Sequence, residues 1–227
     1  LRRSRPSRAP AGCCNQDGVH DGRDSGPPGS GAAGARRGPC LPSVPTGECF
    51  AMRALVVYES MFGNTRQIAT AIAGALAHHV EVELVEVGAA PATLPDDVAL
   101  LVVGGPTHAH GMSKPESRAD SAKRAGDRLV SRGNGIREWL ERLPRGSSRV
   151  AAAAFDTRIK GPGLLWGSAA KGADKHLRGL RFRVVAGPES FLVEGPTGPL
   201  FDRLVDGEVE RARRWGELLG SGLAVTA

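Results

Sequence analysis

The stretch from Ala54 to Leu76 restricts the possible folds of this chain more than any other part of it. It begins with an uninterrupted apolar run at 54–58, the pattern of a strand that is buried on both faces of a parallel sheet. A loop containing Gly63 follows, and apolar residues then recur at a spacing of about 3.6 residues, as in an amphipathic helix. A buried strand that leads through a short loop into a helix is the first half of a βαβ unit, so we expect an α/β fold.

The same alternation of apolar runs and amphipathic segments continues to the end of the chain. A second strand is expected at 80–87, where apolar residues alternate with Glu as in an outer strand. Further strands are expected at 98–103, 150–155 and 182–186, the last one resumed at 190–193. Helices are expected at 136–143, 165–177 and 200–219. This order predicts a doubly wound five-stranded parallel sheet with helices on both faces, a three-layer α/β/α arrangement.

Residues 1–51 differ in composition from the rest of the chain. They are rich in Gly, Pro, Ser and Arg, and their few apolar residues show no periodicity, so we expect a disordered low-complexity extension. Met52 is the first methionine and precedes the first strand directly, so we expect the working protein to start there and residues 52–227 to form one domain. The four cysteines all lie in the extension, which leaves the domain without a disulfide or a thiol nucleophile.

The charge and hydropathy patterns exclude several classes of function. The formal net charge is +6, but no basic stripe is interleaved with aromatic residues, so nucleic acid is not an expected partner. No run approaches the ~18 apolar residues of a membrane span. No apolar export segment follows Arg2 and Arg3. The cytoplasm is therefore the expected location.

The loop after the first strand has the chemistry to hold an anion. In doubly wound sheets ligands bind at the carboxyl ends of the strands. The loop runs Ser60, Met61, Phe62, Gly63, Asn64, Thr65. Unpaired amides at the start of a helix, together with the helix dipole, attract a phosphate, and a glycine lets the backbone come close to it. The loop matches neither the lysine-containing P-loop nor the dinucleotide motif. The alternative is an ordinary helix N-terminus with Ser60 and Thr65 as caps.

The same residues resemble the flavodoxin family. Its sequence pattern has two aliphatic residues and an aromatic, then Ser or Thr, a small residue, Thr, Ala and an aliphatic residue at fixed spacing. Every position is met, by Val56, Val57, Tyr58, Ser60, Gly63, Thr65, Ala69 and Ile72. The resemblance extends from about residue 53 to 219 and weakens after the third strand. It implies that the chain binds FMN, with the phosphate held by residues 60–65.

The resemblance also implies that the isoalloxazine ring lies between the loops after the third and fourth strands. The matching positions are Pro106, Thr107, His108, His110, Gly111, Asp156, Thr157 and Arg158. Flavodoxins usually stack a Trp or Tyr on the ring from these loops, and neither residue is present here. Stacking would then come from His108, His110, Met112 or Trp166. Asp156 fits a strand-end cap as well as a ligand contact.

Several charged residues near these loops have two interpretations. Arg158, if it lies beside the N1–O2 edge of the flavin, stabilises the reduced anionic flavin and favours two-electron reduction; otherwise it is a surface arginine. The basic residues between 114 and 132 either dock an acidic partner or a cofactor phosphate, or form a solvated helix face. His108 and His110 lack an evident third ligand, so no metal is expected. Trp139 and Trp215 are expected in the core.

The resemblance implies an FMN-binding redox protein that acts in electron transfer. Its partner would be another redox protein or a small electron acceptor, and the flavin would supply the chemistry, so no catalytic side chain is required. One alternative is an enzyme, an NAD(P)H-dependent flavin reductase of quinone-like acceptors. Another is a domain that keeps the fold and has lost the flavin, because fold alone does not decide function.

Overall fold

The computed structural model describes residues 52–108, 111–146, 148–161, 167–195 and 202–224. The predictions for residues 1–51, His110 and Trp166 therefore lie outside the described residues.

Strands and helices alternate along the described part of the chain. The elements are β1 (Arg53–Tyr58), α1 (Asn64–Leu76), β2 (Glu81–Glu86), η1 (Val87–Ala89), β3 (Val98–His108), β4 (Gly111–Met112), α2 (Pro115–Ala125), η2 (Gly126–Arg128), α3 (Ile136–Arg142), β5 (Ala151–Ile159), α4 (Ala169–Gly179), β6 (Arg183–Val184), β7 (Glu189–Val193) and α5 (Glu208–Ala224).

The strands form a parallel sheet in the order β2-β1-β3-β5-β6, with β7 also paired to β5. This confirms the predicted doubly wound sheet with five strand positions. The fifth position is interrupted, since β6 pairs with the start of β5 and β7 with its end, as the resumption at 190–193 predicted. β2 lies at one edge and is only partly buried, which agrees with its alternating sequence.

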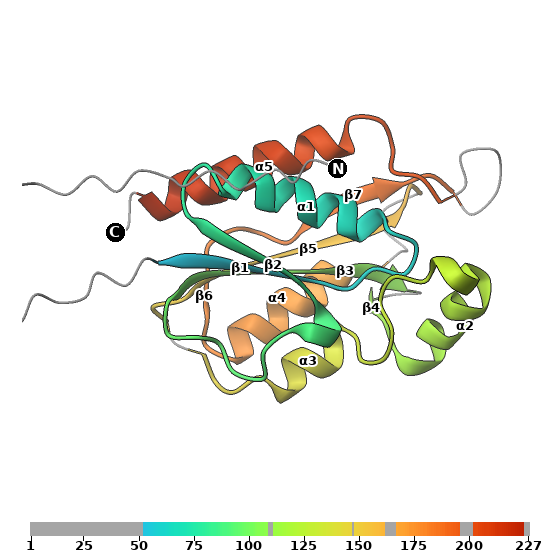
Figure 1. Cartoon of the computed structure of the whole chain (residues 1–227), viewed down its shortest axis with the longest axis horizontal. Helices are drawn as coiled ribbons and strands as arrows, with labels where there is room; N and C mark the ends of the chain where they lie inside the picture. The colour runs from blue at the N-terminus through green and yellow to red at the C-terminus, as the bar shows by residue number, and fades with distance from the viewer. Residues whose placement is uncertain (1–51, 109–110, 147, 162–166, 196–201, 225–227) are drawn as a thin grey trace, which may run out of the picture. The chain divides into compact units, whose positions relative to one another are not determined.

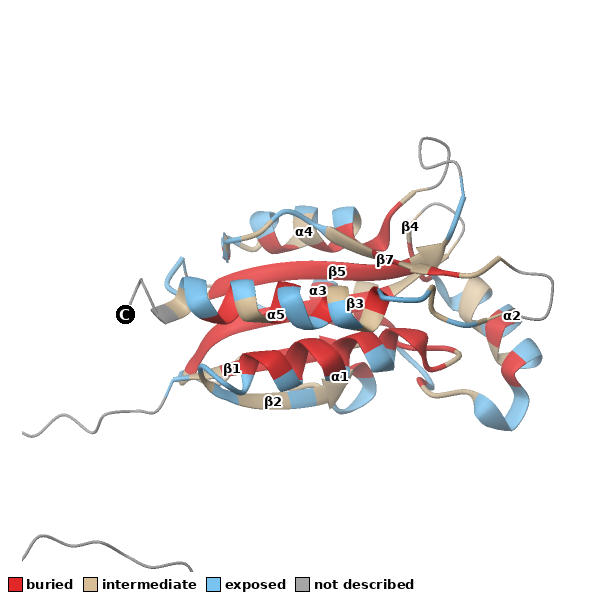
Figure 2. Cartoon of the chain, turned by 90° about the horizontal axis from the view of Figure 1, so that it is seen from above, coloured by how far each residue is buried: buried red, intermediate tan, exposed pale blue. Residues whose placement is uncertain are grey.

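Helices cover both faces of the sheet. In Figure 1, α1 and α5 lie on one face and α3 and α4 on the other, while α2 lies beyond the ends of the strands. Figure 2 shows β1, β3 and β5 buried between these layers. The two layers of core contain one tryptophan each, Trp139 beside α4 and Trp215 against Phe155 and Phe191, as predicted. None of the described helices is long and apolar enough to cross a membrane.

β3 and β5 continue beyond their predicted ends, which corrects the placement of the two expected ring-binding loops. Residues 106–108 and 156–158 lie in these strands, not in loops. β3 and β5 remain paired as far as Pro106 and Thr157, and β7 pairs with the last residues of β5. Hydrogen bonding to the neighbouring strands continues β3 and β5 past the end of their apolar runs and into the polar residues.

The last helix begins later than predicted, at Glu208 instead of residue 200. Residues 203–205, here called the return segment, run antiparallel beside β7. Glu194 N–H donates to the Arg203 carbonyl at 2.8 Å, and Val205 N–H donates to the Leu192 carbonyl at 2.9 Å. Gly207, at φ 84°, then turns the chain into α5. Leu204 of the return segment packs against the core on the α1 and α5 side of the sheet, although the spacing of the apolar residues here resembles that of a helix.

The bounds of α4 also differ from the prediction of 165–177. Residues 165 and 166 lie outside the described residues, and the helix itself runs from Ala169 to Gly179. Ser168 caps it, because its hydroxyl accepts the backbone N–H of Lys171 at 3.1 Å. The polar stretch after residue 114 forms α2 and η2, and neither was assigned bounds from the sequence.

Candidate functional site

A cavity of about 310 Å³ opens at the carboxyl ends of β1, β3 and β5. This volume lies at the lower end of the range for ligand pockets, roughly 300–1,000 Å³. Most of the predicted site residues line it: Ser60, Met61, Phe62, Asn64, Thr65, Pro106, Thr107, His108, Thr157 and Arg158. The strand extension of β3 and β5 brings these residues together, because paired strands present their ends at one edge of the sheet.

Further walls of the cavity come from residues that, apart from Arg124 of the basic stretch, carry no recognisable sequence signal. One face of α2 contributes Ser117, Asp120, Ser121 and Arg124. The end of β5, the end of β7 with the residue after it, and the residue before the return segment contribute Ile159, Val193, Glu194 and Asp202. These residues are far from the flavodoxin-like pattern in sequence, so only the fold places them here.

Three described residues of the predicted site do not line the cavity. Gly63 forms the turn before α1 at φ 97°, and Gly111 belongs to β4. Asp156 is fully buried, and its Oδ2 accepts hydrogen bonds from Thr107 Oγ1, Ser168 Oγ and the Ala170 backbone N–H. Asp156 therefore holds the start of α4, which is the cap interpretation.

Met112 was one of the residues considered for stacking on a flavin ring. Its side chain is 5% exposed and belongs to the core cluster on the α3 and α4 side of the sheet. A Cβ atom built on Gly172 of α4 would lie 3.2 Å from its Cε atom. Met112 thus packs beneath α4, and this position does not support the stacking role.

The segment 60–65 presents free hydrogen-bond donors to the cavity. Within the described part of the chain, no acceptor pairs with the backbone N–H groups of Asn64, Thr65 and Arg66. Ser60 Oγ accepts the N–H of Gly63 at 3.1 Å, so it closes the turn before the helix instead of capping the helix. The first turn of α1 contains no acidic residue. This arrangement is an anion site of the kind that helix N-termini provide.

The hydroxyls of Thr65 and Thr157 lie 2.7 Å apart, which joins α1 to β5 at the floor of the cavity. Two hydroxyl groups carry two protons, and their mutual contact uses only one of them. One O–H group therefore remains to donate to a bound molecule. Both side chains are buried, at 2% and 4% exposure, so that donor is held in a fixed position.

The backbone of the 60–65 segment is fixed by a strand-like contact with residues 130–131. Ser131 Oγ accepts the N–H of Ser60 at 2.9 Å, and the Ser131 N–H donates to the Ser60 carbonyl at 2.8 Å. Val130 N–H donates to the Met61 carbonyl at 3.1 Å. The chain after η2 therefore holds the segment open, a role that no motif in the sequence indicated.

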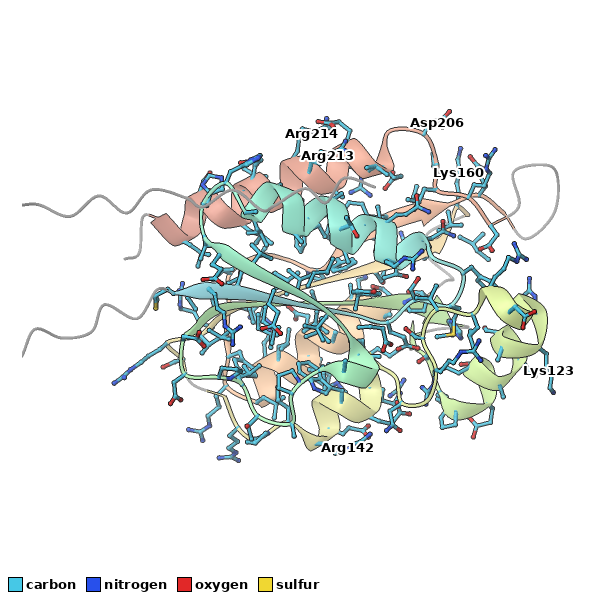
Figure 3. All side chains as sticks on the ribbon, in the orientation of Figure 1. Lys123, Arg142, Lys160, Asp206, Arg213 and Arg214 are labelled. Carbon is cyan, nitrogen blue, oxygen red and sulfur yellow. The ribbon has the colours of Figure 1, made fainter. Side chains whose placement is uncertain are left out.

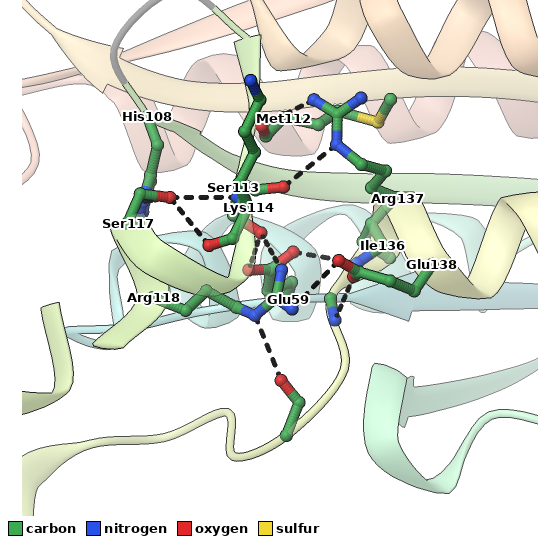
Figure 4. Close-up of polar contacts among 12 residues, drawn as sticks. Glu59, His108, Met112, Ser113, Lys114, Ser117, Arg118, Ile136, Arg137 and Glu138 are labelled. Carbon is green, nitrogen blue, oxygen red and sulfur yellow. Dashed lines mark hydrogen bonds and ion pairs between the residues drawn. The ribbon is translucent and has the colours of Figure 1, made fainter. Parts of the chain in front are cut away.

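Glu59, directly before this segment, is a buried acid at 1% exposure (Figure 4). Its Oε1 accepts from Ser113 Oγ at 2.5 Å and its Oε2 accepts the Ile136 N–H at 2.9 Å. Burial raises the pKa of Glu59, while these hydrogen bonds and the charge of Arg118 oppose the rise. A side chain at Gly135 would collide with this group, since its Cβ would lie 2.6 Å from Glu59 Oε2.

Arg118 connects the same network to α3 (Figure 4). Its guanidinium donates to Ser113 Oγ at 2.9 Å and to Glu138 Oε1 at 3.0 Å, and its Nε donates to the Gly133 carbonyl at 3.1 Å. Burial raises the pKa of Glu138, but hydrogen bonds from Arg118 and Gly135 and the Arg118 charge lower it overall. Arg118 is therefore a structural residue and not part of a solvated basic face.

Two neighbouring basic residues of α2 have different surroundings. Arg124 lines the cavity, with its guanidinium carbon 5.8 Å from the centroid of the Phe62 ring. Lys123 points to solvent (Figure 3), and its 3.6 Å ion pair with Asp120 is largely exposed. Arg124 thus lies where a cofactor phosphate or partner could meet it, which stays a prediction, while Lys123 fits the interpretation of a solvated helix face.

His108 lies at the end of β3, with its Nδ1 3.0 Å from Ser117 Oγ on α2. Burial and the charge of Arg118 lower its pKa, whereas the contact with Ser117 raises it. Because the pKa lies below the ordinary histidine value of 6.5, His108 is neutral near neutral pH. It contributes a polar but uncharged ring to the cavity wall.

Asp202 places a carboxyl group beside the 60–65 segment. Asn64 Nδ2 donates to both the carbonyl oxygen and the Oδ1 of Asp202, each at 3.2 Å. Burial raises the pKa of Asp202, while the charges of Arg128 and Arg124 and the bond from Asn64 oppose the rise. An acid was not expected at a site that otherwise favours anions.

Comparisons with known proteins identify the fold. No protein-family model and no curated protein sequence matches the chain. Among solved structures, oxidised flavodoxin 2 from Bacillus cereus superposes with a TM-score of 0.50 at 20% identity, covering 77% of this chain and 99% of that one. A short-chain flavodoxin associated with a bacterial microcompartment gives 0.51 at 16% identity, covering 76% and 99%. The Flv1 flavodiiron core from Synechocystis gives 0.51 at 14% identity, covering 79% and 38%. Together with the sheet order and the covering helices, these likenesses show that the chain has the flavodoxin-like fold.

Proposed function

We propose that this chain binds FMN in the cavity at the carboxyl ends of β1, β3 and β5 and acts as an electron-transfer flavoprotein. The observation that carries the proposal is the 60–65 segment. It combines the flavodoxin-like sequence pattern with backbone N–H groups that have no acceptor within the described residues, and it opens into a cavity of suitable size. Phosphate recognition by backbone amides at a helix N-terminus needs no lysine.

The donor set of the cavity fits the parts of FMN. The amides of Asn64 to Arg66 and the free hydroxyl of the Thr65–Thr157 pair suit a phosphate. The ends of β3 and β5, with Pro106, Thr107 and Arg158, would hold the ring. FMN, when bound, supplies reversible one- and two-electron chemistry. The chain's own contribution is to bind, to orient and to limit access of water.

Two side chains at the ring end set the electrostatic environment. His108 is neutral near neutral pH, so it offers hydrogen bonding without charge. Arg158 is partly buried at the cavity wall and carries a permanent positive charge. A cation near a reducible ring favours its reduced anionic form, so we assign Arg158 to raising the affinity for electrons.

The decisive experiment measures flavin binding by the full chain. We expect the purified protein, after mixing with FMN and removal of free ligand, to retain about one FMN per chain and to show a perturbed visible spectrum. A protein that stays colourless at saturating FMN refutes the proposal and leaves a fold without its flavin.

A second measurement separates a carrier from an enzyme. The yellow protein is mixed with a reduced nicotinamide cofactor and a benzoquinone, with no other protein present. We expect slow exchange for a carrier that needs a partner protein. Rapid multiple turnovers identify a flavin-dependent reductase instead, and they change the assignment of the partner but not that of the cofactor.

A further inference from the structure

A carboxyl group lies beside the proposed phosphate site, in contact with the side chain of Asn64. Asp202 lines the same cavity as Asn64 and Thr65. The side-chain amide of Asn64 is one of the donors of the 60–65 segment, and its nitrogen donates to two oxygens of Asp202, the backbone carbonyl and Oδ1. A phosphate that uses this amide has to displace the carboxylate from it.

The position of Asp202 is fixed by the hydrogen bonds of the adjacent return segment and by its own backbone conformation. The return segment is hydrogen-bonded to the edge of β7 directly after Asp202, through Arg203 and Val205. Asp202 itself has φ 62°, in the left-handed region that Asp and Asn tolerate better than most residues. These contacts and this backbone conformation together direct the side chain of Asp202 toward Asn64.

The N-terminus of α1 lacks the negative charge that helices usually have at this end. Gly63 provides no side-chain cap, and the first turn contains no acidic residue. The helix dipole is stabilised by a carboxylate near its positive end. Asp202 supplies this charge from 138 residues away in sequence, through its contact with Asn64. In the protein without ligand, Asp202 thus acts as the anion of the site.

We infer that Asp202 competes with the phosphate group of the flavin, and that this competition sets the pH range in which the chain retains a phosphorylated flavin. The inference rests on the proposed function, because it concerns the same cavity. A phosphate monoester carries roughly −1.5 to −2 charges near neutral pH. Two negative groups that share one donor set oppose each other, and the opposition ends when the carboxyl group is protonated.

The sign of the pH effect follows from the environment of Asp202. Burial raises its pKa above the usual 3.8, and a phosphate bound nearby raises it further. At pH values above that pKa the carboxylate is charged and weakens phosphate binding; at lower pH values it is neutral and the weakening is lost. The charges of Arg124 and Arg128 reduce the opposition without removing it. Other titratable groups on the same cavity are His108, Asp120, Arg158 and Glu194.

The test compares the full chain with its Asp202→Asn variant. Asparagine has the same size, keeps an acceptor for the Asn64 amide and tolerates the left-handed backbone, so the variant removes mainly the charge. FMN and riboflavin are titrated at about pH 7.5 and at about pH 3.5, the second of which lies below the ordinary aspartate value of 3.8 and therefore below the raised pKa of Asp202. Riboflavin lacks the phosphate, so its affinity measures binding of the ring and the ribityl chain without the competition between Asp202 and a phosphate.

We expect the variant to bind FMN about tenfold more tightly than the wild type at the higher pH, the effect of roughly one pKa unit of like-charge coupling. The advantage shrinks toward none at the lower pH, and riboflavin affinity is the same for both proteins at both pH values. Asp206→Asn is the matched control. It removes an exposed charge four residues further along (Figure 3), and we expect it to change FMN affinity less than twofold.

Other outcomes overturn the inference. Equal FMN affinities, or an advantage that is independent of pH, show that no competition occurs. Weaker binding of both flavins shows that Asp202 holds the ribityl chain instead. Inorganic phosphate serves as a second probe through its effect on the melting temperature. If neither protein binds any flavin but phosphate stabilises the variant more than the wild type, the competition stands and the proposed function fails; equal stabilisation refutes the competition.

Discussion

Ser113 donates a 2.5 Å hydrogen bond from its Oγ to Oε1 of Glu59, and this contact joins the residue after β4 to the residue before the 60–65 segment. The other carboxylate oxygen of Glu59 accepts the first backbone N–H of α3, from Ile136. One buried acid therefore fixes the positions of three chain segments that meet beside the cavity. The stability of the site should depend on the space around this acid and on its protonation.

Gly135→Ala tests the space around Glu59. The added Cβ would lie 2.6 Å from Glu59 Oε2 and 2.7 Å from Ser113 Oγ, so the network has to move. We expect the free energy of unfolding to fall by about 1–3 kcal/mol, the usual cost of overpacking. Gly74→Ala in α1 is the control, since nothing lies within 4 Å of its Cβ and alanine favours a helix by up to ~1 kcal/mol. Urea denaturation measures both; equal effects of the two substitutions would contradict the interpretation.

Glu59→Gln tests the protonation of the buried acid. Its pKa in the folded protein is raised above the ordinary 4.5, so the folded state binds the proton more tightly than the unfolded state. Its contribution is therefore most favourable below the unfolded pKa and is lost as the pH rises through the folded pKa. In the wild type, the free energy of unfolding should therefore decline as the pH rises through the folded pKa of Glu59, and we expect the variant to lack this decline. Denaturation at a series of acidic pH values measures both proteins. Glu141→Gln on the exposed side of α3 should leave the pH profile unchanged.

Thr65→Val tests the hydroxyl pair at the floor of the cavity. The substitution keeps the shape of the side chain but removes one of two hydroxyls that lie 2.7 Å apart. We expect FMN affinity to fall about tenfold and riboflavin affinity to change little, because a hydrogen bond to a charged group contributes roughly 1.5–3 kcal/mol. Thr70→Val is the control on the exposed side of α1, where the hydroxyl only bonds the Arg66 carbonyl. Equal losses for both flavins indicate a structural role instead.

Arg158→Gln tests the electrostatic role of the cation at the ring end. Removing a positive charge from the cavity wall disfavours the reduced anionic flavin, so the two-electron reduction potential should become more negative. A loss of ~1 kcal/mol corresponds to roughly 20 mV for a two-electron couple. Lys160→Gln removes an exposed charge two residues further along and is expected to shift the potential less (Figure 3). An unchanged reduction potential for Arg158→Gln shows that Arg158 is an ordinary surface arginine without an effect on the flavin.

The limits of the sequence prediction are visible at β3 and β5. Their apolar centres predicted strands, but their polar ends were taken for loops because periodicity reports burial and not hydrogen bonding. His108 and Arg158 still line the cavity, because the strands that carry them end at the same edge of the sheet. The return segment was wrongly predicted as helix, because the spacing of its few apolar residues resembles that of a helix.

The sequence by itself determined the βαβ order, the buried first strand and the segment 60–65, because these depend on residues that are close together along the chain. Only the tertiary structure decided which distant groups meet this part of the chain: Ser131 at Ser60, Ser113 at Glu59, and Asp202 at Asn64. Their pairings join residues separated by long stretches of chain. Such contacts arise from packing and from the need of buried polar groups for partners, and no local pattern encodes them.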